Sequence, residues 1–162
     1  MPKLFPLALL VTALALAGCG ATGADEVETT IPGIVGGADP EAVGVIEAWS
    51  TALREGDVDG AAEFFALPSE AQNGPARIEI SERADAVSFN RSLPCGAELE
   101  RAVDHAGFVI ATFRLTERPG EGRCGAGTGD VARTAFRISN GEIVEWLRVP
   151  GPAEVPAPGD VV

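Results

Sequence analysis

The 162-residue sequence has no tyrosine and only one histidine, and its single lysine is Lys3. The absence of tyrosine excludes a phenol group as a hydrogen-bond donor in any active site. The 12 Lys and Arg residues are outnumbered by 24 Asp and Glu residues, which gives a formal net charge of −12 at pH 7. Nucleic-acid binding needs a basic surface for phosphate contacts, so this balance argues against it. The acidic half of the chain, residues 25–70, is most simply a solvated face, with a surface for a cation or a basic partner as the alternative.

The first 18 residues have the features of an export signal. Met1-Pro2-Lys3 is a short positive segment, and Leu4–Ala17 is an apolar run that is too short to span a bilayer, which needs about 20 residues. The run ends in Leu16-Ala17-Gly18-Cys19, which resembles the bacterial lipoprotein signal. In that family the cysteine is acylated and becomes the first residue after cleavage. The resemblance implies a signal peptide over residues 1–18 and a lipid anchor on Cys19 that holds an extracytoplasmic domain at the bacterial cell membrane. An ordinary secretory signal with a chance cysteine is the alternative.

Two stretches flank the predicted domain. Residues 19–38 are rich in Gly, Ala, Thr and acids, which is the composition of a flexible linker. Residues 151–162 are proline-rich and show no hydrophobic period, which is typical of a disordered tail. Between them, residues 39–150 form a single domain of ordinary size.

Helical signals dominate the first half of this domain. Asp39 is a good N-cap and Pro40 a good first residue for a helix that ends at Gly56. Asp57 caps a second helix that buries Val58, Ala61, Ala62 and Phe65 and stops at Pro68. We expect a loop over Ser69–Gly74, a short strand over Ala76–Ile80, and a weaker helix from Ser81 to about Leu93 that buries Ala84, Val87 and Phe89.

Strands follow from residue 98 onward. Leu99, Arg101 and Val103 alternate with Glu98, Glu100 and Ala102, and Phe108–Leu115 is a strong strand. Asn140-Gly141 between two alternating runs is the strongest short-range signal for a β-hairpin. The turn places Ile138 opposite Ile143. Simple alternation then puts Phe136 and Leu147 on one face and Trp146 on the other.

Helices followed by an antiparallel meander predict an α+β fold. The segments Trp49–Asp57, Ala61-Ala62 and Phe64-Phe65 resemble the beginning of the nuclear transport factor two-like superfamily, which includes the SnoaL-like proteins. The segment Phe136–Trp146 resembles its end. The resemblance implies a cone-shaped, cystatin-like domain in which N-terminal helices pack on a curved antiparallel sheet around an apolar pocket. It implies no single function, because the superfamily holds isomerases, cyclases, hydrolases and domains that only bind.

Cys95 and Cys124 remain once Cys19 is assigned to the anchor. Two cysteines in an exported domain, each in a connection with Gly or Pro, indicate a disulfide. A metal site is the alternative, but with His105 as the only histidine the four usual ligands are not available. His105 itself falls in a predicted turn, where a solvated side chain is the simplest interpretation. We therefore expect no metal and no cofactor.

Two hypotheses about function stay open. The first is a non-catalytic module that binds an apolar small molecule or an envelope protein. The second is a small pocket enzyme, an isomerase or hydrolase of the SnoaL-like kind, acting on an apolar substrate. The isomerase relatives use a tyrosine donor that this chain lacks, and no spacing singles out the Asp-Arg-Asp set of the epoxide hydrolases. We name no catalytic residue, and the candidates for lining the pocket or core are Trp49, Phe65, Phe89, Phe113, Phe136 and Trp146.

Overall fold

The computed structural model describes residues 37–120 and 122–150. The predicted signal peptide, Cys19, nearly all of the linker and the tail lie outside the described residues, so those predictions stay open. The elements run in the order α1 (Pro40–Glu55), α2 (Val58–Ala62), β1 (Phe65–Gln72), β2 (Ile78–Ile80), α3 (Arg83–Ser92), β3 (Gly96–His105), β4 (Phe108–Thr116), a single 3₁₀ turn (Gly125–Gly127), β5 (Val131–Ser139) and β6 (Glu142–Val149).

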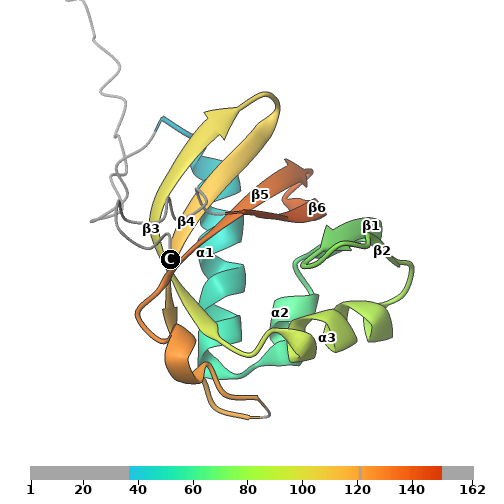
Figure 1. Cartoon of the computed structure of the whole chain (residues 1–162). Helices are drawn as coiled ribbons and strands as arrows, with labels where there is room; N and C mark the ends of the chain where they lie inside the picture. Colours follow the sequence, from blue (N-terminus) through green and yellow to red (C-terminus); the bar gives the residue numbers. More distant parts are fainter. Residues whose placement is uncertain (1–36, 121, 151–162) are drawn as a thin grey trace, which may run out of the picture.

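The six strands form one sheet in the order β2-β1-β6-β5-β4-β3, and this sheet curves around α1 (Figure 1). The predicted α+β class with helices on a curved sheet is therefore confirmed. The sheet is mixed and not wholly antiparallel, because β1 runs parallel to β6. This parallel pairing joins β1 and β2 to the other four strands, and these two strands are the part of the sheet nearest to α2 and α3 (Figure 1).

The first helix begins and ends where the sequence predicts. The Asp39 carboxylate accepts a hydrogen bond from the Glu41 N–H at 3.4 Å, and Pro40 is the first helical residue. Gly56 ends the helix with a φ of 82°, a left-handed conformation that costs glycine little. A Cβ atom at that position would lie 2.8 Å from the Pro119 carbonyl oxygen, so space also requires glycine there.

The second helix is shorter than predicted, and the expected loop after it is a strand. Helix α2 ends at Ala62, and Phe65 is the first residue of β1, fully buried and paired with Ile143 of β6. Pro68 was expected to stop the second helix, but the helix ends six residues before it. Within a strand, proline lacks the N–H that a regular ladder needs. Pro68 falls where the register between β1 and β6 shifts, between Phe65 and Glu70, so the missing donor interrupts no regular pairing.

The third helix begins later than predicted, and the face that it buries is partly a different one. It begins at Arg83, and the Asp85 carboxylate accepts hydrogen bonds from the Ser81 and Glu82 N–H groups, each at 3.1 Å. Ala84 is exposed and Val87 only half-buried. The buried residues are Ala86, Phe89 and Asn90.

A β-bulge changes the faces predicted for the last hairpin. Ile138 pairs with Ile143 as expected, but the next pair is Arg137 with Glu145, so Val144 is an extra residue in β6. One extra residue reverses the alternation beyond it. Trp146 therefore pairs with Phe136 and faces the core, which corrects the assignment of Leu147 to that face. A similar shift in β3, between Leu99 and Arg101, accompanies the full burial of Ala102.

The core is an aromatic cluster enclosed between α1, α3 and the sheet. All six aromatic residues predicted to line the core or pocket are at most 5% exposed. They form seven edge-to-face pairs with ring centroids 5.1–6.3 Å apart. Such pairs contribute about 0.5–1.5 kcal/mol each beyond area burial. The cluster therefore fills most of the interior of the cone and leaves room for a small cavity only.

Candidate functional site

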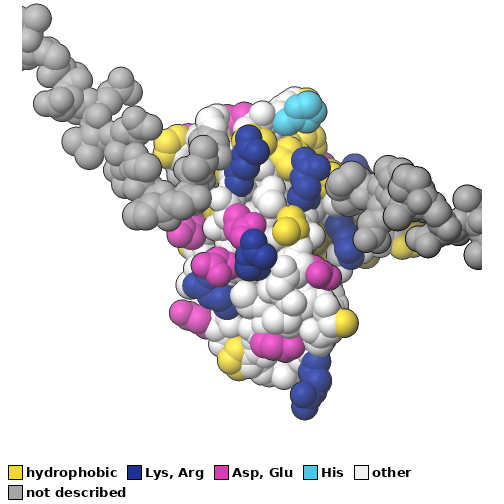
Figure 2. Space-filling model, turned by 60° about the vertical axis from the view of Figure 1, so that its left-hand side comes forward, with side chains coloured by type: hydrophobic (Ala, Val, Ile, Leu, Met, Phe, Trp, Pro, Cys, Tyr) yellow, Lys and Arg dark blue, Asp and Glu magenta, His cyan; other side chains and the backbone are white. Residues whose placement is uncertain are grey.

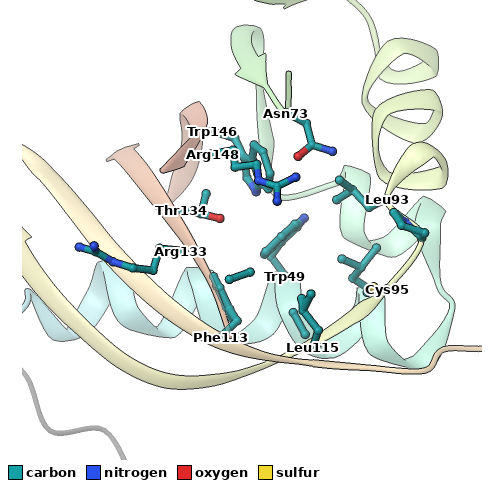
Figure 3. A pocket seen from close by; sticks show the side chains of 14 residues that line it. Trp49, Asn73, Leu93, Cys95, Phe113, Leu115, Arg133, Thr134, Trp146 and Arg148 are labelled. Carbon is teal, nitrogen blue, oxygen red and sulfur yellow. The ribbon is translucent and has the colours of Figure 1, made fainter. Parts of the chain in front are cut away.

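A cavity of about 130 Å³ lies beside this cluster, between α1, the C-terminal end of α3 and strands β3 to β6 (Figure 3). Most of its lining is apolar, and the polar side chains are few. The lining residues are Trp49, Leu53, Asn73, Leu93, Pro94, Cys95, Ala97, Phe113, Leu115, Ala132, Arg133, Thr134, Trp146 and Arg148.

Three of the six predicted aromatic residues line the cavity, and three do not. Trp49, Phe113 and Trp146 form its aromatic wall, with Trp49 6.1 Å from Phe113 and 6.2 Å from Trp146 between ring centroids. Phe65 and Phe89 belong to the core behind Trp146. Phe136 borders a different, shallow hollow near the start of α1. Sequence periodicity selected the right residues but could not say which of them border the space.

The Trp49 ring is held in place by a buried hydrogen bond that the sequence did not reveal. Its Nε1–H donates to Asn90 Oδ1 at 2.9 Å, and Asn90 Nδ2 donates to the Ala86 carbonyl at 2.8 Å. Asn90 is fully buried, and these two bonds give both the oxygen and the nitrogen of its amide a partner within the protein. Trp146 differs, because its buried Nε1–H has no hydrogen-bond partner among the described residues.

The polar side chains of the lining come from β5, from β6 and from the loop that follows β1. They are Arg133, Thr134, Arg148 and Asn73. Arg148 pairs with Thr134 across β5 and β6, two residues beyond the pair of Trp146 with Phe136, so it starts from their face of the sheet, but at the open end of the cavity, where it is exposed to solvent. Figure 3 shows the Arg148 side chain beside Trp146, on the same side of the cavity as Asn73. Arg133 is one residue out of this register, and its side chain extends away from the cavity (Figure 3).

Arg118 supports the wall of the cavity from behind, and no sequence pattern predicted it. Its side chain is only 7% exposed and donates to the Leu93 carbonyl through Nε at 3.1 Å and through Nη2 at 2.7 Å. Nη2 also lies 3.2 Å from the Arg91 carbonyl. Burial lowers the pKa of Arg118. These carbonyls are the open end of α3, where a cation complements the helix dipole.

The predicted disulfide is present and borders the same cavity. Cys95 and Cys124 are bonded, with Cα atoms 4.4 Å apart, so the C-terminal end of α3 is tied to the loop before β5. Glu117 holds this loop through its carboxylate, which accepts hydrogen bonds from the Gly125 N–H at 2.9 Å, Thr128 Oγ1 at 3.0 Å and the Cys124 N–H at 3.3 Å. The Gly125 bond is the largest of the contributions that lower the pKa of Glu117.

The chemistry available in the cavity is limited. Among the described lining residues there is no Asp, Glu or His. His105 is exposed at the end of β3, and Figure 2 shows histidine at the surface, on a face where acidic and basic side chains lie interspersed. Arg114 and Arg137 lie outside the cavity lining and form ion pairs with Glu100 and Glu145.

Neither a metal cluster nor a membrane-spanning helix occurs in the part of the chain that the structure describes. No group of three or more His, Cys, Asp or Glu side chains there is arranged to hold a metal ion. Within residues 37–120 and 122–150, no helix is both long and apolar enough to cross a bilayer.

Comparison with solved structures shows the fold. The domain is similar to a candidate ketosteroid isomerase from Kribbella flavida, at 15% identity and a TM-score of 0.52, covering 75% of this chain and 87% of that one. It is also similar to a nuclear transport factor two-like protein of unknown function from Burkholderia xenovorans, at 17% identity and a TM-score of 0.51, covering 72% and 88% of the two chains.

A de novo designed protein with a curved β-sheet is similar as well, with 14% identity, a TM-score of 0.55, and coverage of 71% of this chain and 88% of that one. No family model matches the sequence, and no curated protein is significantly similar to it. Because a designed protein and an isomerase candidate are both similar to this domain, the similarity shows the architecture and does not indicate an activity. The described domain therefore has the curved-sheet fold of the nuclear transport factor two-like proteins.

Proposed function

We propose that this protein is a non-catalytic binding module that holds a small apolar molecule in the cavity beside Trp49. The observation that carries the proposal is the lining itself, in which an aromatic wall and aliphatic side chains surround a few polar groups at the mouth. Ligand sites in proteins commonly combine such an apolar lining with a small number of polar groups that orient the ligand. The lipoprotein signal would place this module outside the cytoplasm, tethered to the membrane through Cys19.

The cavity supports binding better than it supports catalysis. Acid–base catalysis needs a titrating group within hydrogen-bond reach of the reacting atoms. The ordinary candidates, Asp, Glu and His, are missing from the described lining. The alternative hypothesis, an isomerase or hydrolase of the SnoaL-like kind, is therefore supported only by the similarity of fold.

An envelope protein partner also has less support than a small ligand. Three large hydrophobic side chains are exposed among the described residues: Leu67, Ile78 and Val131. A specific protein interface usually involves about 20–30 residues on each side. These three side chains give little apolar surface from which to build the core of such an interface.

The two tryptophans of the chain provide the test, because Trp49 and Trp146 both line the cavity. The acylated protein in phosphatidylcholine vesicles is titrated with a panel of small aromatic and branched aliphatic compounds, and tryptophan emission is recorded. Saturable changes in intensity or wavelength are expected for compounds of suitable size. Ala97→Phe, which fills the cavity from β3, should abolish the change, while Ala84→Phe on the exposed face of α3 should leave it intact. A panel without any saturable response would contradict the proposal.

A further inference from the structure

Resting on the proposed function, we infer that the ligand is a small carboxylic acid with one apolar ring or short branched chain, and that Arg148 binds its carboxylate. The charge of the lining is the first observation. The protein has a formal net charge of −12, yet the only charged residues in the described lining are Arg133 and Arg148. Arg133 extends away from the cavity, so Arg148 is the one cation at the mouth (Figure 3).

The guanidinium of Arg148 is available to a ligand. Arg77, Arg83, Arg114 and Arg137 each form an ion pair with a glutamate, and Arg118 is occupied by backbone carbonyls. Arg148 has no ion pair and no side-chain hydrogen bond among the described residues, although it is on the strand that carries Glu145. A guanidinium fork matches the two oxygens of a carboxylate.

A second donor in the lining also lacks an acceptor. Trp146 is 5% exposed, and its Nε1–H has no partner among the described residues. A buried donor without an acceptor costs about 1–3 kcal/mol. Because the nitrogen itself is buried, a ligand oxygen would reach it, and remove that penalty, only after a small shift of the indole ring. Arg148, Trp146 and Asn73 all supply N–H donors to the lining, and no carboxylate from the described residues competes for them.

The volume of the cavity sets the size of the apolar part. An engineered cavity of about 150 Å³ lined by aliphatic and aromatic side chains holds benzene. The present cavity, at about 130 Å³, is close to that size. This volume matches a single ring, whereas a steroid or polycyclic skeleton exceeds it. The Arg148 guanidinium at the mouth then lies where a carboxylate on a short chain would emerge.

Matched probes separate charge from shape. Acylated protein in phosphatidylcholine vesicles is titrated with 3-phenylpropionate and with its neutral amide, 3-phenylpropanamide, while the emission of the two tryptophans is followed. The carboxylate should bind about tenfold more tightly than the amide, because only the charged group forms a charge-assisted pair. Arg148→Gln should remove that advantage and leave the affinity for the amide within about twofold.

Two further variants test the geometry. Arg148→Lys keeps the charge without the fork and should retain part of the preference for the carboxylate. Arg101→Gln removes the same charge from an exposed position outside the lining and should change neither affinity. In the NMR spectrum of protein with labelled tryptophan, the indole N–H signal of Trp146 should move on addition of 3-phenylpropionate. That of Trp49, already bonded to Asn90, should move less.

The outcomes distinguish the two proposals. Equal affinity for the two probes, or an unchanged preference in Arg148→Gln, would overturn the carboxylate inference while leaving apolar binding in place. Absence of binding by 3-phenylpropionate, its amide and every compound of the larger panel would overturn both.

Discussion

Trp49 Nε1 donates a hydrogen bond to Asn90 Oδ1 at 2.9 Å, and this bond joins α1 to α3 across the wall of the cavity. Both side chains are almost completely buried, at 2% and 0% exposure. A buried hydrogen-bonded pair of this kind destabilises the folded state little while both partners are present. Removing one partner lowers the free energy of unfolding much more, because the other is left buried without a hydrogen bond. The position of the aromatic wall therefore depends on one amide side chain.

Replacing Asn90 should destabilise the fold through the partner that it leaves behind. Asn90→Ala leaves the Trp49 donor buried without an acceptor, and the free energy of unfolding should fall by about 2–3 kcal/mol. Urea denaturation measures the change. Ser88→Ala, on the exposed side of the same helix, is the control and should alter stability by less than about 0.5 kcal/mol. A loss below about 1 kcal/mol in Asn90→Ala would show that water reaches the indole.

Truncating Trp49 tests the packing of α1 on the sheet. Its ring meets Phe113, Phe136 and Trp146 edge-on and is 2% exposed. Trp49→Ala should lower the free energy of unfolding by about 3–5 kcal/mol, the range for aromatic residues removed from a core. Because the remaining tryptophan still reports unfolding, fluorescence in denaturant measures the loss. A change under about 1 kcal/mol would contradict the buried position of the ring.

The disulfide should stabilise the fold by restricting the unfolded chain. Cys95 and Cys124 are 29 residues apart, and closing a loop of this length gives an entropic stabilisation of about 3–4 kcal/mol. The paired substitution of Cys95→Ala and Cys124→Ala should lower the free energy of unfolding by that amount. Alkylation of the native protein without reductant should label neither sulfur, whereas alkylation after reduction and unfolding should label both. Labelling of both in the native, unreduced protein would contradict the bridge.

The sequence predicted best those features that depend on neighbours in the chain. The Asp39 cap, the Gly56 end of α1 and the hairpin at Asn140-Gly141 are local, and each is confirmed. The pairing of Cys95 with Cys124 followed from the number of cysteines and the expected compartment. Pairing between distant segments was harder to predict from the sequence. The segment around Pro68 is a strand only because it pairs in parallel with β6, which lies far away in the chain.

Features created by a single extra residue or by a distant partner were missed. The bulge at Val144 has no clear mark in the sequence, yet it decides that Trp146 faces the core. Asn90 and Arg118 resemble ordinary surface residues, and their burial depends on partners at Trp49 and Leu93. The same extra residue brings Arg148 into register with Thr134, so the position of Arg148 at the cavity mouth could not be predicted without the bulge.

Lipidation is the prediction on which the location of the protein depends. Leu16-Ala17-Gly18-Cys19 predicts cleavage just before Cys19 and acylation of its sulfur. Cys19→Ala should therefore accumulate as an uncleaved precursor without acyl mass. Detergent partitioning and mass analysis of the N-terminus measure both properties, with Cys95→Ala as a control that keeps the anchor. A mature protein that begins at another residue, or that lacks acyl mass, would rule out the lipid anchor.

Glu117 should make the loop that carries Cys124 sensitive to acid. Hydrogen bonds from the Gly125 N–H and from Thr128, together with weaker contributions from the Cys124 N–H and the charge of Arg123, hold the pKa of Glu117 below its ordinary value of 4.5. A carboxylate whose pKa is lowered by folding binds fewer protons in the folded state than in the unfolded state. Its stabilising effect is therefore complete above about pH 4.5 and is lost as the pH falls through the lower pKa of the folded protein.

Glu117→Gln should then flatten this part of the pH dependence. The amide can still accept hydrogen bonds but carries no charge to titrate, so the variant should be less stable than the parent at pH 6 and should approach the parent's stability as the pH falls below the lowered pKa of Glu117. Thermal unfolding measured across this range, with Glu79→Gln as a control in strand β2, resolves the difference. Hydrogen exchange of the Gly125 N–H, which donates to Glu117 at 2.9 Å, should accelerate in the variant at neutral pH. Parallel melting curves for parent and variant at every pH would mean that the loop is held by the disulfide and the backbone alone.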